Sequence, residues 1–243
     1  MIPIQDTVRG RHPPLAMYAI LGLNVLVFAM ELRLRPEDLE ELFYLFGIVP
    51  ARYAHPAWAE RVGFPVDNYW PLLTSMFLHG GWMHIIGNMW TLWIFGDNVE
   101  DRMGPLRFAV FYLLCGLVAA VVQGLTNADS VVPTVGASGA IAGVMGAYFV
   151  LFPRAQVVVL VPIFFYPLFF RVPAVAYLLF WALSQVLNGT MAITGPGEVG
   201  GVAWWAHVGG FSAGLLLHPL FLRPRQEIRP FQPDEYGTEG AWS

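Results

Sequence analysis

Ser138 is a lone hydroxyl among small neighbours in a largely apolar part of the sequence. It follows Gly136 and Ala137, precedes Gly139, and opens a run of small and apolar residues of the kind that begins a helix. The first N–H groups of a helix have no acceptor inside it, and the helix dipole adds partial positive charge there. A hydroxyl at such a place can act as a nucleophile, because these donors stabilise the oxyanion that its attack produces. The same small residues also pack membrane helices closely, which is the alternative interpretation.

His84 and Asn88 form a second polar pair in apolar surroundings. They are four residues apart, so they lie on one face of a helix, which we expect to begin near residue 81, where two glycines interrupt the apolar run. Both side chains can donate hydrogen bonds to a developing oxyanion, together with the backbone N–H groups around Ala137 and Ser138.

His207 is the candidate general base for Ser138, because an imidazole accepts and returns a proton near neutral pH. His207, Gly210 and Gly214 fall on one face of a predicted helix, where the glycines allow a neighbouring backbone to approach closely. A lone histidine beside glycines can also serve only to satisfy a backbone carbonyl.

The composition is that of a membrane protein. Of 243 residues, 56% are hydrophobic and 12% are charged, whereas soluble domains carry about 25% charged residues. The net charge is −4 and the sequence contains no basic cluster, so we expect no nucleic-acid partner. Cys115 is the single cysteine, which excludes an intramolecular disulfide and a cysteine-rich metal site.

Six gaps between charged residues are long enough to hold the about 20 apolar residues that cross a bilayer. We therefore predict an all-α membrane protein, a bundle of six transmembrane helices with a long outer loop between the first two. A seventh gap, 155–170, is shorter and contains Pro162 and Pro167, so we expect a loop or interfacial segment there. The six long gaps are 12–30, 68–96, 108–128, 130–153, 172–197 and 199–222.

The arginines orient the bundle, since basic residues favour cytoplasmic loops and the chain has no lysine. Most arginines lie in loops that share a side when both termini are cytoplasmic, and we expect a multi-pass protein of the cell membrane. The chain then divides into a cytoplasmic N-terminal segment (1–14), a membrane domain (15–222) and a cytoplasmic tail (223–243).

This orientation brings the candidate residues to one depth. The second, fourth and sixth helices run from outside to inside, so His84, Ser138 and His207 all fall in outer first turns. No Asp or Glu lies in the outer half of these helices to orient the histidine. The predicted arrangement is therefore a Ser–His dyad and not a triad.

The connection between the first two helices, about residues 31–70, is long and rich in aromatic residues. Acidic residues and leucines interleave over 37–43, which predicts a short amphipathic helix. Two roles stay open for this loop: a lateral gate or membrane anchor, and a structural lid over the helix ends.

The motifs together resemble the rhomboid family of intramembrane serine proteases. The resemblance extends over residues 15–222 and rests on four pieces that occur in order. The pieces are His84-x-x-x-Asn88, Asn98-Val-Glu100-Asp-Arg102-Met-Gly104, Gly136-Ala-Ser138-Gly139 and Ala206-His207-x-x-Gly210-x-x-x-Gly214.

The resemblance implies a compact six-helix core in which Ser138 is the nucleophile and His207 the general base. His84, Asn88 and the Ser138 amide would form the oxyanion hole. The implied partners are single-span transmembrane substrates in the lipid bilayer, cut at small residues near the outer face, and neither a cofactor nor a metal is implied.

Two further positions follow from the same resemblance. Glu100 and Arg102 would be structural residues at the cytoplasmic end of the second helix. Some family members carry an aromatic residue four positions after the serine that stacks on the histidine. Here that position is Ala142, so the resemblance does not say what holds His207.

Three alternatives compete with an intramembrane serine endopeptidase. A metal site at His79, His84 and His207 is disfavoured, because no His-Glu-x-x-His motif or partnered carboxylate accompanies them. A proteolytically silent rhomboid-like binder of transmembrane clients is disfavoured because both dyad residues are present. A small transporter would be favoured by inverted-repeat symmetry, which the sequence does not show.

Overall fold

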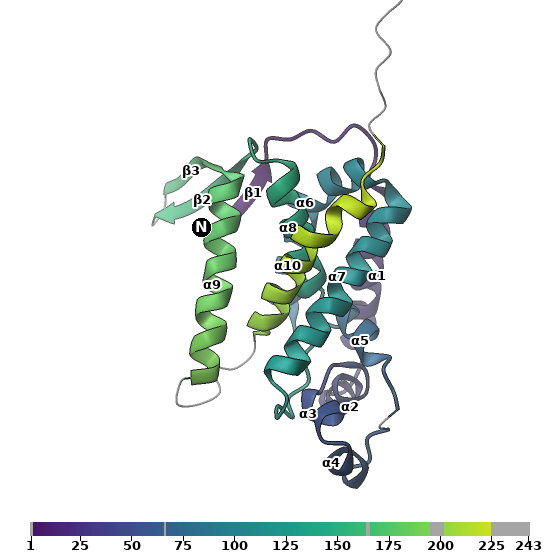
Figure 1. Ribbon diagram of the computed structural model, residues 1–243. Helices are drawn as coiled ribbons and strands as arrows, with labels where there is room; N and C mark the ends of the chain where they lie inside the picture. Colours follow the sequence, from purple (N-terminus) through teal and green to yellow (C-terminus); the bar gives the residue numbers. More distant parts are fainter. Residues whose placement is uncertain (1, 66, 164–165, 195–201, 225–243) are drawn as a thin grey trace, which may run out of the picture.

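The computed structural model describes residues 2–65, 67–163, 166–194 and 202–224, and these residues are predominantly helical (Figure 1). Short elements occupy the connection after the first helix: α2 (Pro36–Phe46), α3 (Pro50–Ala54), α4 (Pro56–Arg61), α5 (Pro71–Thr74) and the 3-10 helix η1 (Ser75–Phe77). The six longest helices are α1 (Leu15–Glu31), α6 (Trp82–Met103), α7 (Pro105–Thr126), α8 (Ser138–Leu151), α9 (Ala174–Thr194) and α10 (Trp204–Phe221).

Helix α8 lies at the centre of the bundle, and every residue of it from 139 to 148 is buried. Its small side chains allow α10 to approach until the two backbones touch. A Cβ atom at Gly210 or Gly214 would overlap the carbonyl oxygen of Gly139 or Gly143, respectively. The two helices are thereby held at a fixed height relative to each other.

Helices α6, α8 and α10 run in the same direction through the bundle, from the end that holds α2 to α5 toward the opposite end (Figure 1). Helix α6 begins at Trp82 after Gly81, which confirms the helix start predicted near residue 81. The first turns of all three helices therefore lie at one end of the molecule.

A three-stranded antiparallel sheet lies at the end opposite to α2 to α5, in the order β1 (Ile2–Asp6), β2 (Gln156–Ile163) and β3 (Tyr166–Pro173) (Figure 1). The prediction of an all-α protein is wrong in this respect, and so is the prediction of a loop over 155–170. Val157 and Val159 are fully buried, and burial of this β-branched run favours a strand.

The two prolines that argued for a loop are compatible with the sheet. Pro162 and Pro167 lie opposite each other in the β2–β3 register. Strand β1 pairs only with residues 157–160 of β2, so Pro162 lies outside the three-stranded part. Pro167 belongs to the edge strand β3, where a missing N–H does not interrupt a further ladder.

Two carboxylates, the half-buried Asp6 and the buried Glu100, fasten the N-terminal part of the chain to the sheet end of the bundle. Asp6 accepts hydrogen bonds from the Tyr148 hydroxyl and, at 2.9 Å, from Asn98 Nδ2. Burial raises the pKa of the Asp6 carboxyl, and the hydrogen bond from Tyr148 opposes that shift only in part. Glu100 accepts hydrogen bonds from the N–H groups of Ala16 and Met17, at 3.0 and 2.7 Å. Its negative charge thus faces the positive end of α1.

Two helices in the described part of the chain, α7 and α9, are long and apolar enough to cross a membrane by length and composition. Their mean hydropathy over 18 residues is 2.2 and 1.3, respectively. Helices α1 and α8 are apolar but shorter. The outer surface of α9 is apolar, with Phe180 and Leu183 largely exposed.

The long connection after α1 is an ordered unit with its own interior. The amphipathic helix predicted around 37–43 is confirmed as α2, whose first turn carries Glu37 and Asp38. Arg52 is fully buried, donates hydrogen bonds to the Pro65 carbonyl at 3.0 and 3.2 Å, and lies over the Phe64 ring. The predicted cytoplasmic tail lies outside the described residues from position 225 onward.

Candidate active site

Backbone hydrogen bonds to two other segments of the chain fix the residues that precede α8 and Ser138. Thr134 exchanges two backbone hydrogen bonds with Ile48, at 2.8 and 2.9 Å. The N–H of Gly136 donates to the Ser75 carbonyl at 2.8 Å. Gly136 has a φ of +128°, and a Cβ atom there would lie 2.6 Å from His84 Nε2. Glycine is therefore required at 136 both by the backbone conformation and by the neighbouring imidazole.

Ser138 is the first residue of α8 and His207 lies in the first turn of α10. The distance between Ser138 Oγ and His207 Nε2 is 2.8 Å. Ser138 is half-buried, whereas His207 is only 9% exposed. The hydroxyl can give its proton to Nε2 directly when that nitrogen is unprotonated, so this pair has the geometry of a nucleophile and its base.

Helix α9 supplies two of the groups that surround the histidine, Gln185 and Trp181, and α10 itself supplies the third, Trp204. Gln185 Oε1 lies 2.8 Å from His207 Nδ1. The Trp181 ring lies beside the imidazole, with centroids 5.7 Å apart and planes inclined by 37°. Trp204 approaches edge-on at 6.3 Å. Trp181 is thus an aromatic neighbour of the imidazole, although position 142 holds alanine.

Gln185 and Trp181 were not predicted as site residues. They are four positions apart on α9, the same spacing as His84 and Asn88 on α6. A polar glutamine within a predicted transmembrane span, one turn from a tryptophan, could therefore have indicated a site residue from the sequence alone.

His84 and Asn88 lie around Gly136, two residues before the serine. His84 Nδ1 accepts a hydrogen bond from the N–H of Gly80 at 3.3 Å. In a neutral ring Nε2 then carries the proton and becomes a donor next to Gly136. Asn88 is 7% exposed, and its Nδ2 has no hydrogen-bond partner among the described residues. Two side-chain donors therefore lie near the start of α8, where its first backbone N–H groups also lack helical acceptors.

Replacing Asn88 with alanine is expected to lower the turnover number of peptide cleavage by up to about 100-fold, because one of several oxyanion donors is lost. Steady-state kinetics on a transmembrane substrate would measure this effect. The fold should remain intact, since the Asn88 amide nitrogen has no partner to lose in the described part of the chain. Unchanged turnover would show that Asn88 is not an oxyanion donor.

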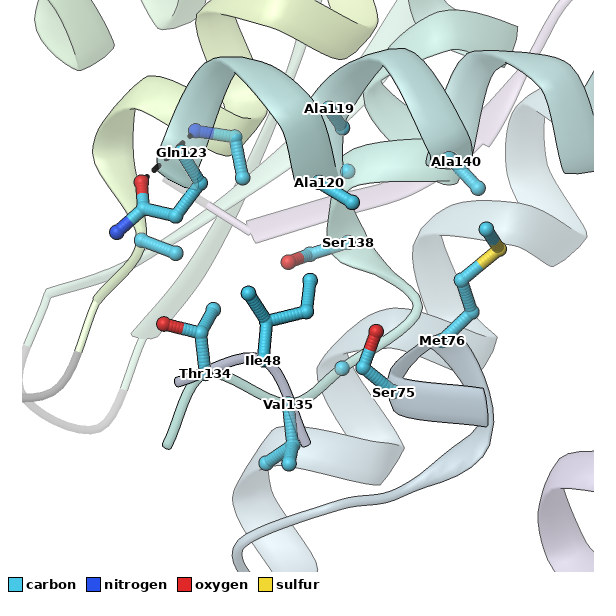
Figure 2. A pocket seen from close by; sticks show the side chains of 15 residues that line it. Ile48, Ser75, Met76, Ala119, Ala120, Gln123, Thr134, Val135, Ser138 and Ala140 are labelled. Carbon is cyan, nitrogen blue, oxygen red and sulfur yellow. Dashed lines mark hydrogen bonds between the residues drawn. The ribbon is translucent and has the colours of Figure 1, made fainter. Parts of the chain in front are cut away.

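A small cavity of about 30 Å³ adjoins the serine. In Figure 2 the Ser138 hydroxyl points into this space above Ile48, with Gln123 toward one end and Met76 toward the other. Gln123 Oε1 accepts the N–H of Ala206 at 3.2 Å. The walls come mostly from alanine, glycine and other small residues of α7, of α8 with the segment before it, and of the start of α10. The volume is that of about one water molecule or a very small side chain.

The comparison with known proteins agrees with the motifs. The family model described as the Rhomboid domain matches residues 66–224. This match covers well over half of the chain and includes all four candidate residues on α6, α8 and α10. The chain belongs to the rhomboid family. The resemblance inferred from the sequence is therefore confirmed, and rhomboids are membrane-embedded and generally intramembrane serine proteases.

Individual rhomboids match over different lengths. Rhomboid protein 1, mitochondrial, of Saccharomyces cerevisiae is 27% identical over 209 residues, which are 84% of this chain and 53% of that protein. RHOMBOID-like protein 4 of Arabidopsis thaliana is 31% identical over 159 residues, 65% of this chain and 36% of the relative. The putative rhomboid protease YdcA of Bacillus subtilis is 30% identical over 115 residues, 45% and 57% of the two chains. The chain thus spans less than two thirds of the length of these relatives.

Proposed function

We propose that this rhomboid is an intramembrane serine endopeptidase that uses a Ser–His dyad. The observation that carries the proposal is the 2.8 Å contact between Ser138 Oγ and His207 Nε2. Ser138 Oγ attacks the scissile carbonyl carbon while its proton passes to His207 Nε2. The C–N bond then breaks as the imidazolium returns that proton to the leaving amine. Water, deprotonated by the same nitrogen, releases the acyl group from Ser138.

The oxyanion of both tetrahedral intermediates would be held by donors around Gly136. These are His84 Nε2, Asn88 Nδ2 and the backbone N–H groups around Ala137 and Ser138. Two observations support this assignment: the Gly80 contact requires a proton on Nε2 of the neutral His84 ring, and the Asn88 amide nitrogen has no hydrogen-bond partner among the described residues. Preorganised donors of this kind act most strongly where water is excluded.

The six long helices would each cross the bilayer, with both termini and the sheet in the cytoplasm. The distribution of arginines and the apolar exterior of α9 support this arrangement. Helix α8 has 14 residues, so it is about 21 Å long, less than the about 30 Å of a hydrocarbon core. Ser138 would then lie below the outer membrane surface, within reach of a transmembrane segment.

The substrates would be membrane proteins whose transmembrane segment unwinds locally at the scissile bond. A peptide bond within a helix is shielded by its own hydrogen bonding, so residues that weaken the helix make it accessible. The small cavity beside Ser138 favours side chains of the size of alanine or serine next to that bond. No cofactor and no metal enter this chemistry.

A matched pair of substrates tests this function in proteoliposomes that contain the purified protein. One substrate has a uniformly leucine-rich transmembrane segment, and the other carries glycine and alanine at its outer end. We expect the second to be cleaved at least about 10-fold faster, since each glycine weakens a helix by about 1 kcal/mol relative to alanine. Equal cleavage of both substrates would reject local unwinding, and cleavage of neither would reject the proposed function.

A further inference from the structure

The structure assigns a third residue to the catalytic pair. We propose that Gln185 of α9 is a positioning residue that fixes the tautomer of His207, so that the unprotonated Nε2 faces Ser138. This inference rests on the proposed function for its kinetic consequences. Its structural basis is a chain of hydrogen bonds that begins at a backbone carbonyl of α9.

The orientation of the Gln185 amide is determined by the carbonyl oxygen of Trp181. Gln185 Nε2 lies 3.0 Å from this oxygen and 2.8 Å from Ser184 Oγ. Ser184 Oγ in turn donates to the same carbonyl at 2.6 Å. A carbonyl oxygen can only accept, so the NH₂ group of the amide must point toward it. The amide oxygen is consequently directed at His207.

The orientation of the amide determines the tautomer of the imidazole. Gln185 Oε1 can only accept a hydrogen bond, so His207 Nδ1, at 2.8 Å, must carry the proton. A neutral imidazole holds one proton, which leaves the lone pair of Nε2 free. That lone pair faces Ser138 Oγ. The opposite tautomer would place an N–H against the serine and could not act as its base.

Burial makes this arrangement effective. Gln185 is 4% exposed and His207 is 9% exposed, and the indole rings of Trp181 and Trp204 lie beside the imidazole. Bulk water therefore cannot readily replace the amide oxygen as acceptor. When His207 becomes an imidazolium, the same oxygen dipole faces its positive charge, as a carboxylate does in a triad.

Gln185 differs from Ser138 and His207 in the helix that carries it, which is α9. Ser138 and His207 are on α8 and α10, whose backbones touch through glycines. Helix α9 has an apolar outer surface and packs chiefly on α10. The orientation of the base therefore depends on α9 keeping its place beside α10.

Three variants test the role. Gln185→Met keeps the length and volume of the side chain but cannot accept a strong hydrogen bond. Gln185→Glu retains an oxygen that can accept from His207 Nδ1, but its second oxygen cannot donate to the Trp181 carbonyl as the amide does. Asn188→Leu is the matched control, because Asn188 lies one turn further along α9 and donates to the Ser184 carbonyl at 2.8 Å, whereas the ring nitrogens of His207 bond to Gln185 and Ser138.

For Gln185→Met we expect kcat and the rate of fluorophosphonate labelling to fall by about 10- to 100-fold, with KM within about 2-fold of wild type. Gln185→Glu should recover part of the loss, and Asn188→Leu should match wild type. A purely structural role would instead lower folded yield and leave the rate per folded molecule unchanged. The role is overturned if Gln185→Met keeps kcat and labelling within about 2-fold of wild type.

Nitrogen-15 NMR of histidine-labelled protein gives a readout that needs no protease activity. In wild type we expect His207 protonated at Nδ1, and in Gln185→Met a mixture of tautomers. A wild-type ring protonated at Nε2 would overturn the proposal even if the protein is an active protease. If the wild-type protein neither cleaves a substrate nor reacts with fluorophosphonate, the proposed function is rejected. The NMR result would still show whether Gln185 accepts the proton of His207 Nδ1.

Discussion

Ser138→Ala is expected to lower peptide cleavage by at least about 10⁴-fold, because removal of a nucleophile leaves only binding and the oxyanion donors. The variant should fold like wild type. Ser138 is half-buried at the first position of α8, and alanine is well tolerated in a helix. Single-turnover cleavage of a reconstituted transmembrane substrate would measure the effect.

Ser212 on α10 provides the matched control for this substitution. Its side chain is exposed on the same helix that carries His207, so Ser212→Ala removes a hydroxyl without touching the pair. We expect wild-type cleavage from this variant. A comparable loss in both variants would attribute the effect to folding or to assay conditions and not to a nucleophile.

His207→Ala is expected to reduce cleavage to about the same residual level, at least about 10⁴-fold below wild type. The serine keeps its hydroxyl in this variant but loses the group that takes its proton at 2.8 Å. Residues that act as one unit are strongly non-additive, so the double variant with Ser138→Ala should be no slower than either single variant. Single-turnover kinetics on all three proteins would measure this.

His218 provides the matched control for His207→Ala, because it distinguishes the loss of a catalytic group from the loss of a packed histidine. It is a buried histidine near the other end of α10, and its Nδ1 contacts the Leu215 carbonyl at 2.9 Å. His218→Ala should lower thermal stability while its folded fraction keeps wild-type kcat. Multiplicative losses in the Ser138 and His207 double variant would contradict a shared catalytic step.

The sequence allowed the long helices to be predicted because charge is excluded from long apolar segments. It placed His84, Ser138 and His207 in first turns of helices that run in parallel, and the structure places them there. These predictions needed only local information: glycine breaks and the spacing of charges.

The partners of His207 could not be predicted in the same way. Gln185 reaches the imidazole because of the rotation and height of α9, which depend on packing against α10 and not on local propensity. The pairing of Ile48 with Thr134 is likewise a contact between distant segments. The sheet was missed because prolines within an apolar run favour a loop when the strand order is unknown.

Labelling of the purified protein with a fluorophosphonate, followed by peptide mapping by mass spectrometry, tests the central claim most directly. Such a reagent bonds covalently to a serine only where a base activates its hydroxyl. We predict one adduct, on the peptide that contains Ser138, and none in Ser138→Ala. An adduct on another serine, or cleavage that persists in Ser138→Ala, would contradict the assignment of Ser138 as the nucleophile.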